Sequence, residues 1–198
     1  MSLEELRRAL AGRAFSTLDP SALSPEYLRT EGALRHAAVL VPLFDRDAGP
    51  HVLLTRRRPD LRHHPGQISF PGGQVEPFDT DSLSAALREA REEVGIEPSD
   101  VDVLGRLSET LVVVTGFRLT PWVGVVPYPY RWVPHPGEVA ETLEVPLVEL
   151  LRPGVHRTEP REVHGMTHEV HFFALGSDTI WGATARVLSE LLSAWRPA

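Results

Sequence analysis

The most constraining feature of this sequence is an amphipathic segment, residues 82–94, that carries the signals of a complete helix. Residues 79–82 (Asp-Thr-Asp-Ser) offer capping side chains at its start, and Gly95 offers a C-terminal stop. An apolar stripe at spacings of four, three and four is formed by Leu83, Leu87, Ala90 and Val94. We therefore expect a helix here that packs against a core through this stripe.

Three glutamates lie on another face of this helix: Glu89, Glu92 and Glu93, at positions i, i+3 and i+4. One interpretation is a solvated acidic face with Arg88 and Arg91 nearby to compensate. However, like charges at i and i+4 destabilise a helix, and acids in its last turns oppose the macrodipole. A divalent cation reverses both penalties, and carboxylates combined with water and phosphate suit Mg²⁺ or Mn²⁺. We therefore expect these three glutamates to bind such a cation.

Composition limits what kind of protein this is. The chain has 198 residues, of which 42% are hydrophobic and 24% charged, as in one ordinary globular domain. It has no cysteine, which excludes thiol catalysis and cysteine-bound zinc. The net charge of −7 disfavours nonspecific binding to nucleic acid or to an anionic membrane. No apolar stretch approaches the roughly 18 residues that span a bilayer, and the N-terminus lacks the apolar core of a secretory signal. We expect a cytoplasmic protein with a small-molecule partner, and the oligomeric state stays open.

The rest of the chain divides into an N-terminal appendage, residues 1–31, and a main domain, residues 32–198. The appendage combines a helix over 3–12 with a Pro/Ser-rich connector over 16–25. Apolar runs and turn residues in the main domain predict a hairpin of 37–44 with 51–55, strands near 67–70, 101–111, 117–126 and 163–175, and helices near 147–151 and 180–195. Strands and helices do not alternate regularly, which favours an α+β or sandwich-like arrangement over a doubly wound parallel sheet.

A glycine-rich turn precedes the acidic helix at Pro71-Gly72-Gly73, where glycines permit close approach of the backbone to a ligand. This turn, followed by Arg88-Glu89-Ala90-Arg91-Glu92-Glu93-Val94-Gly95-Ile96, resembles the Nudix box. Asp79 occupies the usual glutamate position, and eight rather than seven residues then precede Arg88. The resemblance implies an α/β/α sandwich around a mixed sheet, covering most of residues 32–198.

A second motif lies upstream: Leu53-Leu54-Thr55-Arg56-Arg57, then Arg62, Gly66 and Phe70-Pro71-Gly72-Gly73. It resembles the signature of the coenzyme A pyrophosphatase branch of Nudix hydrolases, with Arg58 where that signature has serine. The extra residue before Arg88 is also familiar in this branch. The resemblance implies hydrolysis of coenzyme A to 3′,5′-ADP and 4′-phosphopantetheine with Mg²⁺ or Mn²⁺.

Catalysis at a diphosphate requires neutralised charge and an activated water. Arg88 is expected to be structural, holding the loop or a neighbouring glutamate, and the Gly73 carbonyl region to complete the metal shell. The general base is either a glutamate of the acidic helix or a loop acid. Glu138, in a Pro/Gly-rich segment, is the best remote candidate, although an exposed loop acid without function has the same pattern. Glu141 and Glu144 follow it closely and remain alternatives.

Substrate recognition is expected from Arg56 and Arg62, because guanidinium groups bind phosphate through paired hydrogen bonds, and from the Gly72–Gly73 backbone. We expect Arg57 and Arg58 to face solvent. His63 and His64 have the pattern of surface residues more than of ligands. Two other functions stay open: a Nudix hydrolase of ADP-ribose, NADH or another nucleoside diphosphate derivative, and a non-catalytic nucleotide-binding module.

Overall fold

The centre of the fold is a hairpin of two long apolar strands, β1 (Arg35–Arg46) and β2 (Gly49–Arg57). They pair antiparallel, with Leu43 opposite Val52, so the predicted hairpin is confirmed. The computed structural model describes residues 2–11, 15–17, 34–47, 49–112, 116–163 and 166–195.

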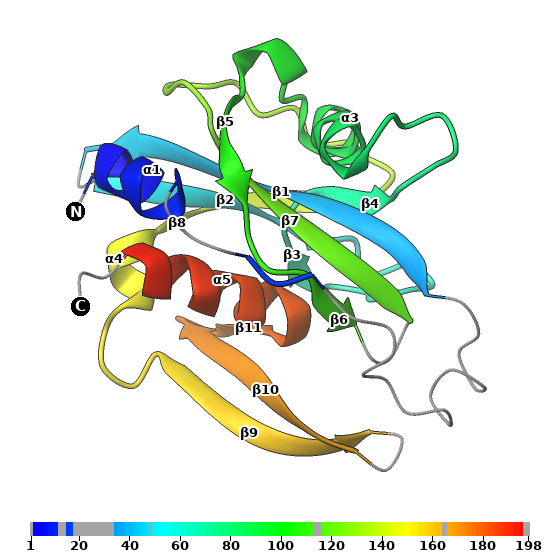
Figure 1. The fold of residues 1–198 in the computed structure, drawn as a ribbon, viewed down its shortest axis with the longest axis vertical. Coiled ribbons are helices and arrows are strands. Elements are labelled where there is room, and N and C mark those ends of the chain that lie inside the picture. The colour runs from blue at the N-terminus through cyan, green and yellow to red at the C-terminus, as the bar shows by residue number, and fades with distance from the viewer. Residues whose placement is uncertain are drawn as a thin grey trace.

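The hairpin belongs to a mixed sheet, to which the described chain contributes eight strands. β1 runs parallel to β7 (Phe117–Val125), whereas the other pairings are antiparallel. Two strands pair with β2: β3 (Ile68–Ser69) and β8 (Val139–Pro146). Strand β4 (Gly72–Gln74) pairs with β1. Two further strands pair with β7: β5 (Asp102–Arg106) and β6 (Thr110–Val112). Figure 1 shows these strands as one layer crossing the molecule.

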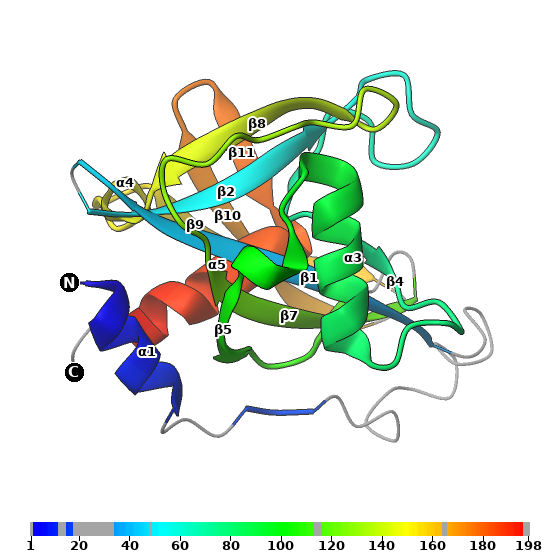
Figure 2. The same ribbon diagram turned by 90° about the horizontal axis from the view of Figure 1, so that it is seen from above.

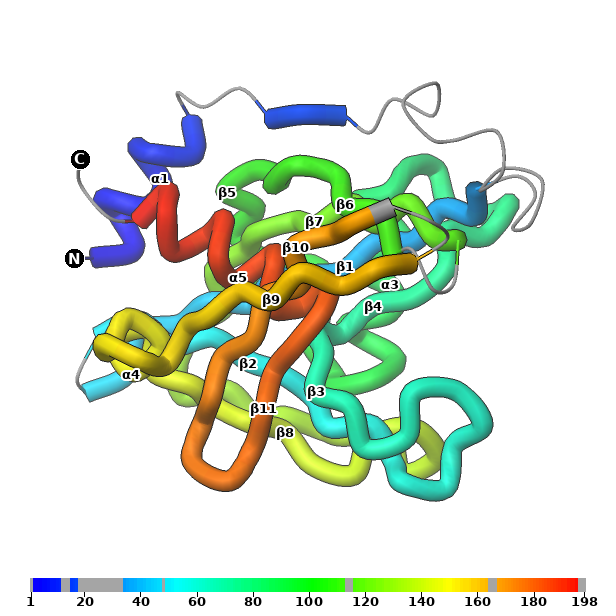
Figure 3. The backbone as a smooth tube through the Cα atoms, turned by 90° about the horizontal axis from the view of Figure 1, so that it is seen from below, coloured from blue at the N-terminus to red at the C-terminus, as the bar shows by residue number. Residues whose placement is uncertain are grey.

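Helices cover both faces of this sheet. Helix α3 (Ser82–Val94) lies on one face, as seen from above in Figure 2. Helices α5 (Gly182–Trp195) and α1 (Leu3–Ala11) lie on the other face, as seen in Figure 3. Alternate β1 residues serve the two sides, because Leu40 packs with the α3 cluster and Val41 with the α5 cluster. The predicted α/β/α sandwich around a mixed sheet is confirmed.

A second, smaller antiparallel sheet lies below α5, formed by β9 (His156–Val163), β10 (Met166–Leu175) and β11 (Asp178–Trp181). The sequence predicted a helix from Ile180, which is wrong at its start. Ile180 and Trp181 pair with β10, and the chain becomes helical only after Gly182, whose φ is +68°. The strand near 163–175 corresponds to β10, whereas β8 and β9 were not predicted.

Two short helical elements join the strands. The 3₁₀ turn η2 (Pro98–Asp100) leads into β5, and α4 (Leu147–Leu150) follows β8 where a helix was predicted. In α1, Leu6 and Leu10 are buried in the same apolar cluster as α5. The predicted boundary between residues 31 and 32, and residues 18–25 of the predicted connector, lie outside the described residues. Among the helices that are described, none is long and apolar enough to cross a membrane.

Helix α3 packs on the sheet mainly through alanines, not through the two leucines of the predicted apolar stripe. Its buried apolar residues are Ala85, Ala86, Ala90 and Val94, whereas Leu83 and Leu87 are only half-buried. Alanines have small side chains, so the backbone of α3 comes near β1 and β4. The acids next to these alanines are therefore drawn toward the sheet. The predicted separation of an apolar and an acidic face therefore fails at Glu93, which is buried among the core-facing residues.

Candidate active site

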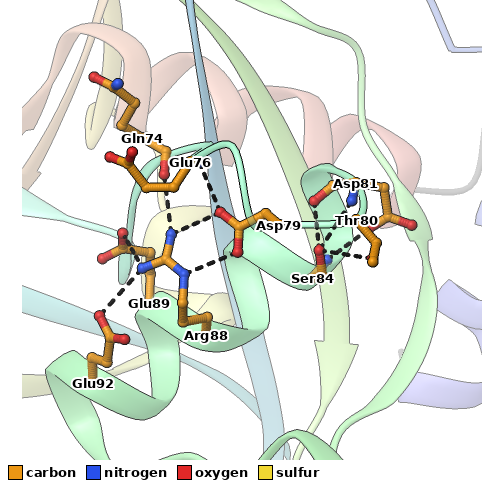
Figure 4. A network of polar contacts seen from close by, with 9 residues as sticks. All are labelled: Gln74, Glu76, Asp79, Thr80, Asp81, Ser84, Arg88, Glu89 and Glu92. Carbon is orange, nitrogen blue, oxygen red and sulfur yellow. Dashed lines mark hydrogen bonds and ion pairs between the residues drawn. The ribbon is translucent and has the colours of Figure 1, made fainter.

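Helix α3 is fixed at both ends, which sets the position of its acids. Asp81 caps the start: its side chain accepts a hydrogen bond from Ser84 N, and Ser84 reciprocates toward the Asp81 backbone, as Figure 4 shows. Gly95 ends the helix in a left-handed conformation with φ of 73°. The predicted bounds, 82–94, are confirmed.

Glu93 is the buried acid of the site. Its side chain is 7% exposed, and Arg57 Nη1 lies 3.9 Å from its Oε1. Burial raises the pKa of Glu93 to about 8, with the charge of Glu89 adding to the effect, while Arg57 and a backbone hydrogen bond from Gly72 oppose it. The raised pKa means that the negative charge of ionised Glu93 is poorly compensated, so binding of a cation beside this carboxylate would be favourable.

Glu89 and Glu92 differ in their surroundings. Glu89 is half-buried, and burial raises its pKa although Arg88 Nη1 donates to it at 2.7 Å. Glu92 is 59% exposed at its side chain and receives a 3.2 Å hydrogen bond from the same Arg88 atom. Glu89 and Glu93 thus face the sheet together, and Glu92 stands at the solvent edge.

The glycine-rich turn lies directly beneath these acids as strand β4. A Cβ atom on Gly73 would lie 2.6 Å from both Cδ and Oε1 of Glu89, so no larger residue fits without moving that carboxylate. A Cβ on Gly72 would lie 2.4 Å from Ala38 O, and the Gly72 φ of +157° adds strain. The two glycines therefore let the backbone of β4 approach the Glu89 carboxylate and strand β1 closely.

Arg88 is structural, as expected. Its Nε and Nη2 donate to Asp79 at 3.0 and 2.9 Å, and Nη2 also donates to Gln74 O at 3.1 Å (Figure 4). These bonds hold the pKa of the Asp79 carboxyl below its usual range. Asp79 further accepts a hydrogen bond from Glu76 N at 2.8 Å. Asp79 therefore closes the loop before α3 and acts on the site through Arg88.

Arg57 is the main difference from the expected roles of the basic residues. The sequence placed it toward solvent, but its side chain is only 26% exposed and its Nε is buried without a partner in the described part of the chain. The preceding residue, Arg56, is instead paired with two carboxylates: it donates hydrogen bonds to Glu141 and Asp178 at 2.6 and 2.7 Å.

The placement of Arg57 follows from the alternation of side chains along β2. Leu53 packs with the α3 cluster and Leu54 with the α5 cluster, so Arg57, four residues after Leu53, also faces α3. Arg58 then pairs with Asp60 and donates to Pro136 O at 2.9 Å. Within the arginine run, Arg57 is thus the residue directed at the acidic site.

Glu138 lies in a loop that is tied to the end of α3. His135 N donates to Glu93 O at 2.8 Å, and Val133 N donates to Val94 O at 2.9 Å. The charge of Glu138 contributes to the raised pKa of both Glu89 and Glu93, so this loop acid lies within electrostatic range of them.

The two acids that follow Glu138 point to other partners. Glu141 pairs with Arg56, and Glu144 pairs with Arg46 and accepts a 2.6 Å hydrogen bond from Trp132 Nε1. Glu141 and Glu144 thus lie in strand β8 with partners of their own, whereas Glu138 lies in the loop before it and is exposed to solvent.

The loop between β2 and β3 carries the remaining predicted residues. Arg62 and His63 are exposed. His64 is also exposed, has a φ of +53°, and lines a cavity of about 750 Å³. This cavity lies on the face of the sheet opposite α3, and its lining also includes Arg57, Gly72 and Gly73. The acidic site and the cavity therefore share one border.

The donor chemistry of the site fits a hard divalent cation. Glu89, Glu92, Glu93 and the nearby Gly72–Gly73 backbone offer oxygen atoms only, the ligand type that Mg²⁺ and Mn²⁺ prefer. In the described chain, no three acidic or histidine side chains are gathered closely enough to complete a site by themselves. Substrate phosphate and water usually supply the remaining ligands of such cations.

Comparison with known proteins agrees with this architecture. A NUDIX domain model matches residues 34–164. A protein of Cronobacter sakazakii, named uncharacterized Nudix hydrolase NudL, is 43% identical over 171 residues, which cover 85% of this chain and 87% of the relative. A relative of the same name from Enterobacter sp. (strain 638) is 41% identical with the same coverage.

Solved structures show the same fold. The crystal structure of a MutT/nudix family protein from Enterococcus faecalis superposes with a TM-score of 0.55 and 16% identity, covering 98% of this chain and 74% of that one. The Nudix hydrolase RenU from M. smegmatis gives a TM-score of 0.50 at 24% identity, covering 62% of this chain and 79% of that one.

Proposed function

This chain belongs to the Nudix family, and from that premise we propose that it hydrolyses the diphosphate bond of coenzyme A and its derivatives. The products are 3′,5′-ADP and 4′-phosphopantetheine or its acyl derivative. The cofactor is Mg²⁺ or Mn²⁺.

One observation carries the choice of coenzyme A. The segment that bears the branch signature, residues 53–73, forms β2, the following loop, β3 and the start of β4, and it borders both the acidic site and the cavity. The cavity residues that this segment supplies are Arg57, His64, Gln67, Ser69, Phe70, Gly72 and Gly73. A signature that lines the space beside the acids is suited to reading the substrate.

The acids supply the charge chemistry. Glu89, Glu92 and Glu93 would hold the cation, which neutralises phosphate charge and lowers the pKa of bound water. The raised pKa values of Glu89 and Glu93 support this assignment, because a cation relieves the cost of ionising buried carboxyls. Arg88 and Asp79 position Glu89 and the loop before it.

The other polar groups act on the substrate itself. Arg57, whose side chain is partly exposed, binds a phosphate oxygen. Glu138 accepts a proton from the water that attacks phosphorus, while the bridging oxygen leaves with the second phosphate. Arg62, exposed on the motif loop, is free to reach a further phosphate. Arg56 supports β2 through its two carboxylate partners.

A substrate panel tests the proposal. Coenzyme A, ADP-ribose and NADH are incubated with the protein in Mg²⁺ or in Mn²⁺, and products are resolved by mass, with Glu93→Gln as the matched inactive control. Preferential formation of 3′,5′-ADP and 4′-phosphopantetheine from coenzyme A is expected. Faster cleavage of ADP-ribose or NADH would reassign the substrate. No cleavage of any of the three would favour a non-catalytic nucleotide-binding module.

A further inference from the structure

We infer that the cavity of about 750 Å³ on the face of the sheet opposite α3 binds the uncharged pantetheine arm of the substrate, leaving the phosphorylated adenosine outside it. This inference rests on the proposed function and adds the orientation of the substrate. The cavity lies between the large sheet and the second sheet, and it is bounded by β1, β4, β6, β7, β10, β11 and the first turn of α5.

Position is the first argument. Arg57, Gly72 and Gly73 line one end of the cavity and also border the acidic site, where Gly73 lies under Glu89 and Arg57 faces Glu93. A diphosphate held at the acids therefore has one substituent directed into the cavity. The second substituent must leave toward solvent, on the side of the exposed loop that carries Arg62.

Charge decides which substituent enters. Among the described lining residues, two arginines, Arg57 and Arg186, are balanced by two glutamates, Glu109 and Glu169. The adenosine half carries a 3′-phosphate with nearly two negative charges at neutral pH, as phosphomonoesters do. A lining without surplus positive charge does not compensate that dianion. An arm without charge needs no such compensation.

The walls match an aliphatic arm that carries amides. Much of the lining is apolar, including Val39, Phe70, Leu119 and Val170. Polar side chains are interspersed among them, including Gln67 and Ser69. The pantetheine arm, with its two amides, has the same mixture of apolar and hydrogen-bonding groups.

The experiment measures the two halves of the substrate separately. Calorimetry with Mg²⁺ gives the dissociation constants of 4′-phosphopantetheine and of 3′,5′-ADP for three proteins. Val170→Trp fills the cavity from β10. Thr167→Trp, at an exposed position of the same strand outside the lining, is the matched control. We expect Val170→Trp to weaken 4′-phosphopantetheine tenfold or more and to leave 3′,5′-ADP within twofold, with Thr167→Trp equal to wild type.

Other results overturn the inference. Weakened 3′,5′-ADP with unchanged 4′-phosphopantetheine would place the nucleotide in the cavity. No change in either constant would show that the cavity binds neither half. Thermal melting checks each fold, and Ala183→Phe replaces Val170→Trp if the latter does not fold.

Wild-type activity separates this inference from the proposed function. A wild-type protein that hydrolyses ADP-ribose or NADH but not coenzyme A contradicts the proposed function, and the inference falls with it. A wild-type protein that hydrolyses coenzyme A, with cavity variants that bind 4′-phosphopantetheine normally, contradicts only the orientation argued here.

Discussion

Arg57 Nη1 lies 3.9 Å from Glu93 Oε1, joining the end of β2 to the last turn of α3. The contact is longer than a hydrogen bond, and Arg57 Nε is buried with no partner in the described residues. The pKa of Glu93 is raised to about 8 despite this neighbour, so one guanidinium does not compensate the buried acid. Arg57 therefore retains donors for an anionic ligand at the point where the acidic site meets the cavity.

Replacing Arg57 by Gln should lower kcat/KM for coenzyme A by about one to two powers of ten, because a charge-assisted hydrogen bond contributes roughly 1.5–3 kcal/mol. Arg56→Gln is the comparison. It breaks ion pairs to Glu141 and Asp178, so it should lower the melting temperature with less effect on kcat/KM. Steady-state kinetics and thermal melts of both variants check this. A larger kinetic loss in Arg56→Gln would return phosphate binding to that residue.

The contrast between these two arginines shows what local sequence determines and what it does not. Helix α3 was predicted with its observed bounds because its caps are local, at Asp81 and Gly95. The face to which Arg57 points follows from alternation along β2, but its partner on that face, Glu93, is set by the packing of α3, a segment far along the chain. No pattern within the arginine run reports that partner.

Strand β9 shows a second limit. Its residues are mostly exposed on both sides and include Pro160, so it lacks the alternation that identifies a half-buried strand. Its existence depends on pairing with β10. The position of Glu89 and Glu93 on one side of α3 was predicted from helical spacing. The depth of Glu93 was not, because it results from the small alanines that bring α3 close to the sheet.

Glu93→Gln should lower turnover by orders of magnitude while raising the stability of the metal-free protein. The folded pKa of about 8 exceeds the ordinary value of 4.5, so the native state binds more protons between these pH values and stability falls as pH rises through them. The gain in the free energy of unfolding of Glu93→Gln over wild type should be absent near pH 4 and complete above about pH 8. Melting curves across this range, with chelator present, measure it. A variant that is less stable than wild type at pH 8 would indicate a structural ion pair with Arg57.

Gly73→Ala should reduce cation binding without a comparable loss of fold. The added Cβ would lie 2.6 Å from the Glu89 carboxylate, so Glu89 must move away from its position over β4. We expect the rise in melting temperature on adding Mn²⁺ to shrink and kcat to fall at least tenfold. Circular dichroism of the metal-free variant checks the fold. Normal stabilisation by Mn²⁺ would show that the position of Glu89 over Gly73 is not needed for the cation.

Glu138→Gln should reduce kcat while preserving cation affinity, because the charge of this loop acid acts on Glu89 and Glu93 but the residue belongs to another element. General-base catalysis contributes about 10²–10⁴-fold, so the expected loss is of that order. Glu141→Gln, whose carboxylate pairs with Arg56, is the matched control. Mn²⁺ titration followed by melting temperature separates binding from turnover. A loss in kcat below about threefold would move the role of base to an acid of α3.

Arg62→Ala should change discrimination between coenzyme A and its 3′-dephospho form. Arg62 is exposed on the loop between β2 and β3 and is absent from the cavity lining. A 3′-phosphate that remains outside the cavity would therefore be within reach of an exposed residue such as Arg62. A charge-assisted hydrogen bond to that phosphate is equivalent to about one to two powers of ten in specificity. Wild type should therefore cleave coenzyme A with the higher kcat/KM, and Arg62→Ala should narrow the difference by lowering kcat/KM for coenzyme A alone. Equal losses on both substrates would place Arg62 at the diphosphate instead. No loss on either would remove it from the site, and equal wild-type efficiencies would leave the pantetheine arm as the recognised feature.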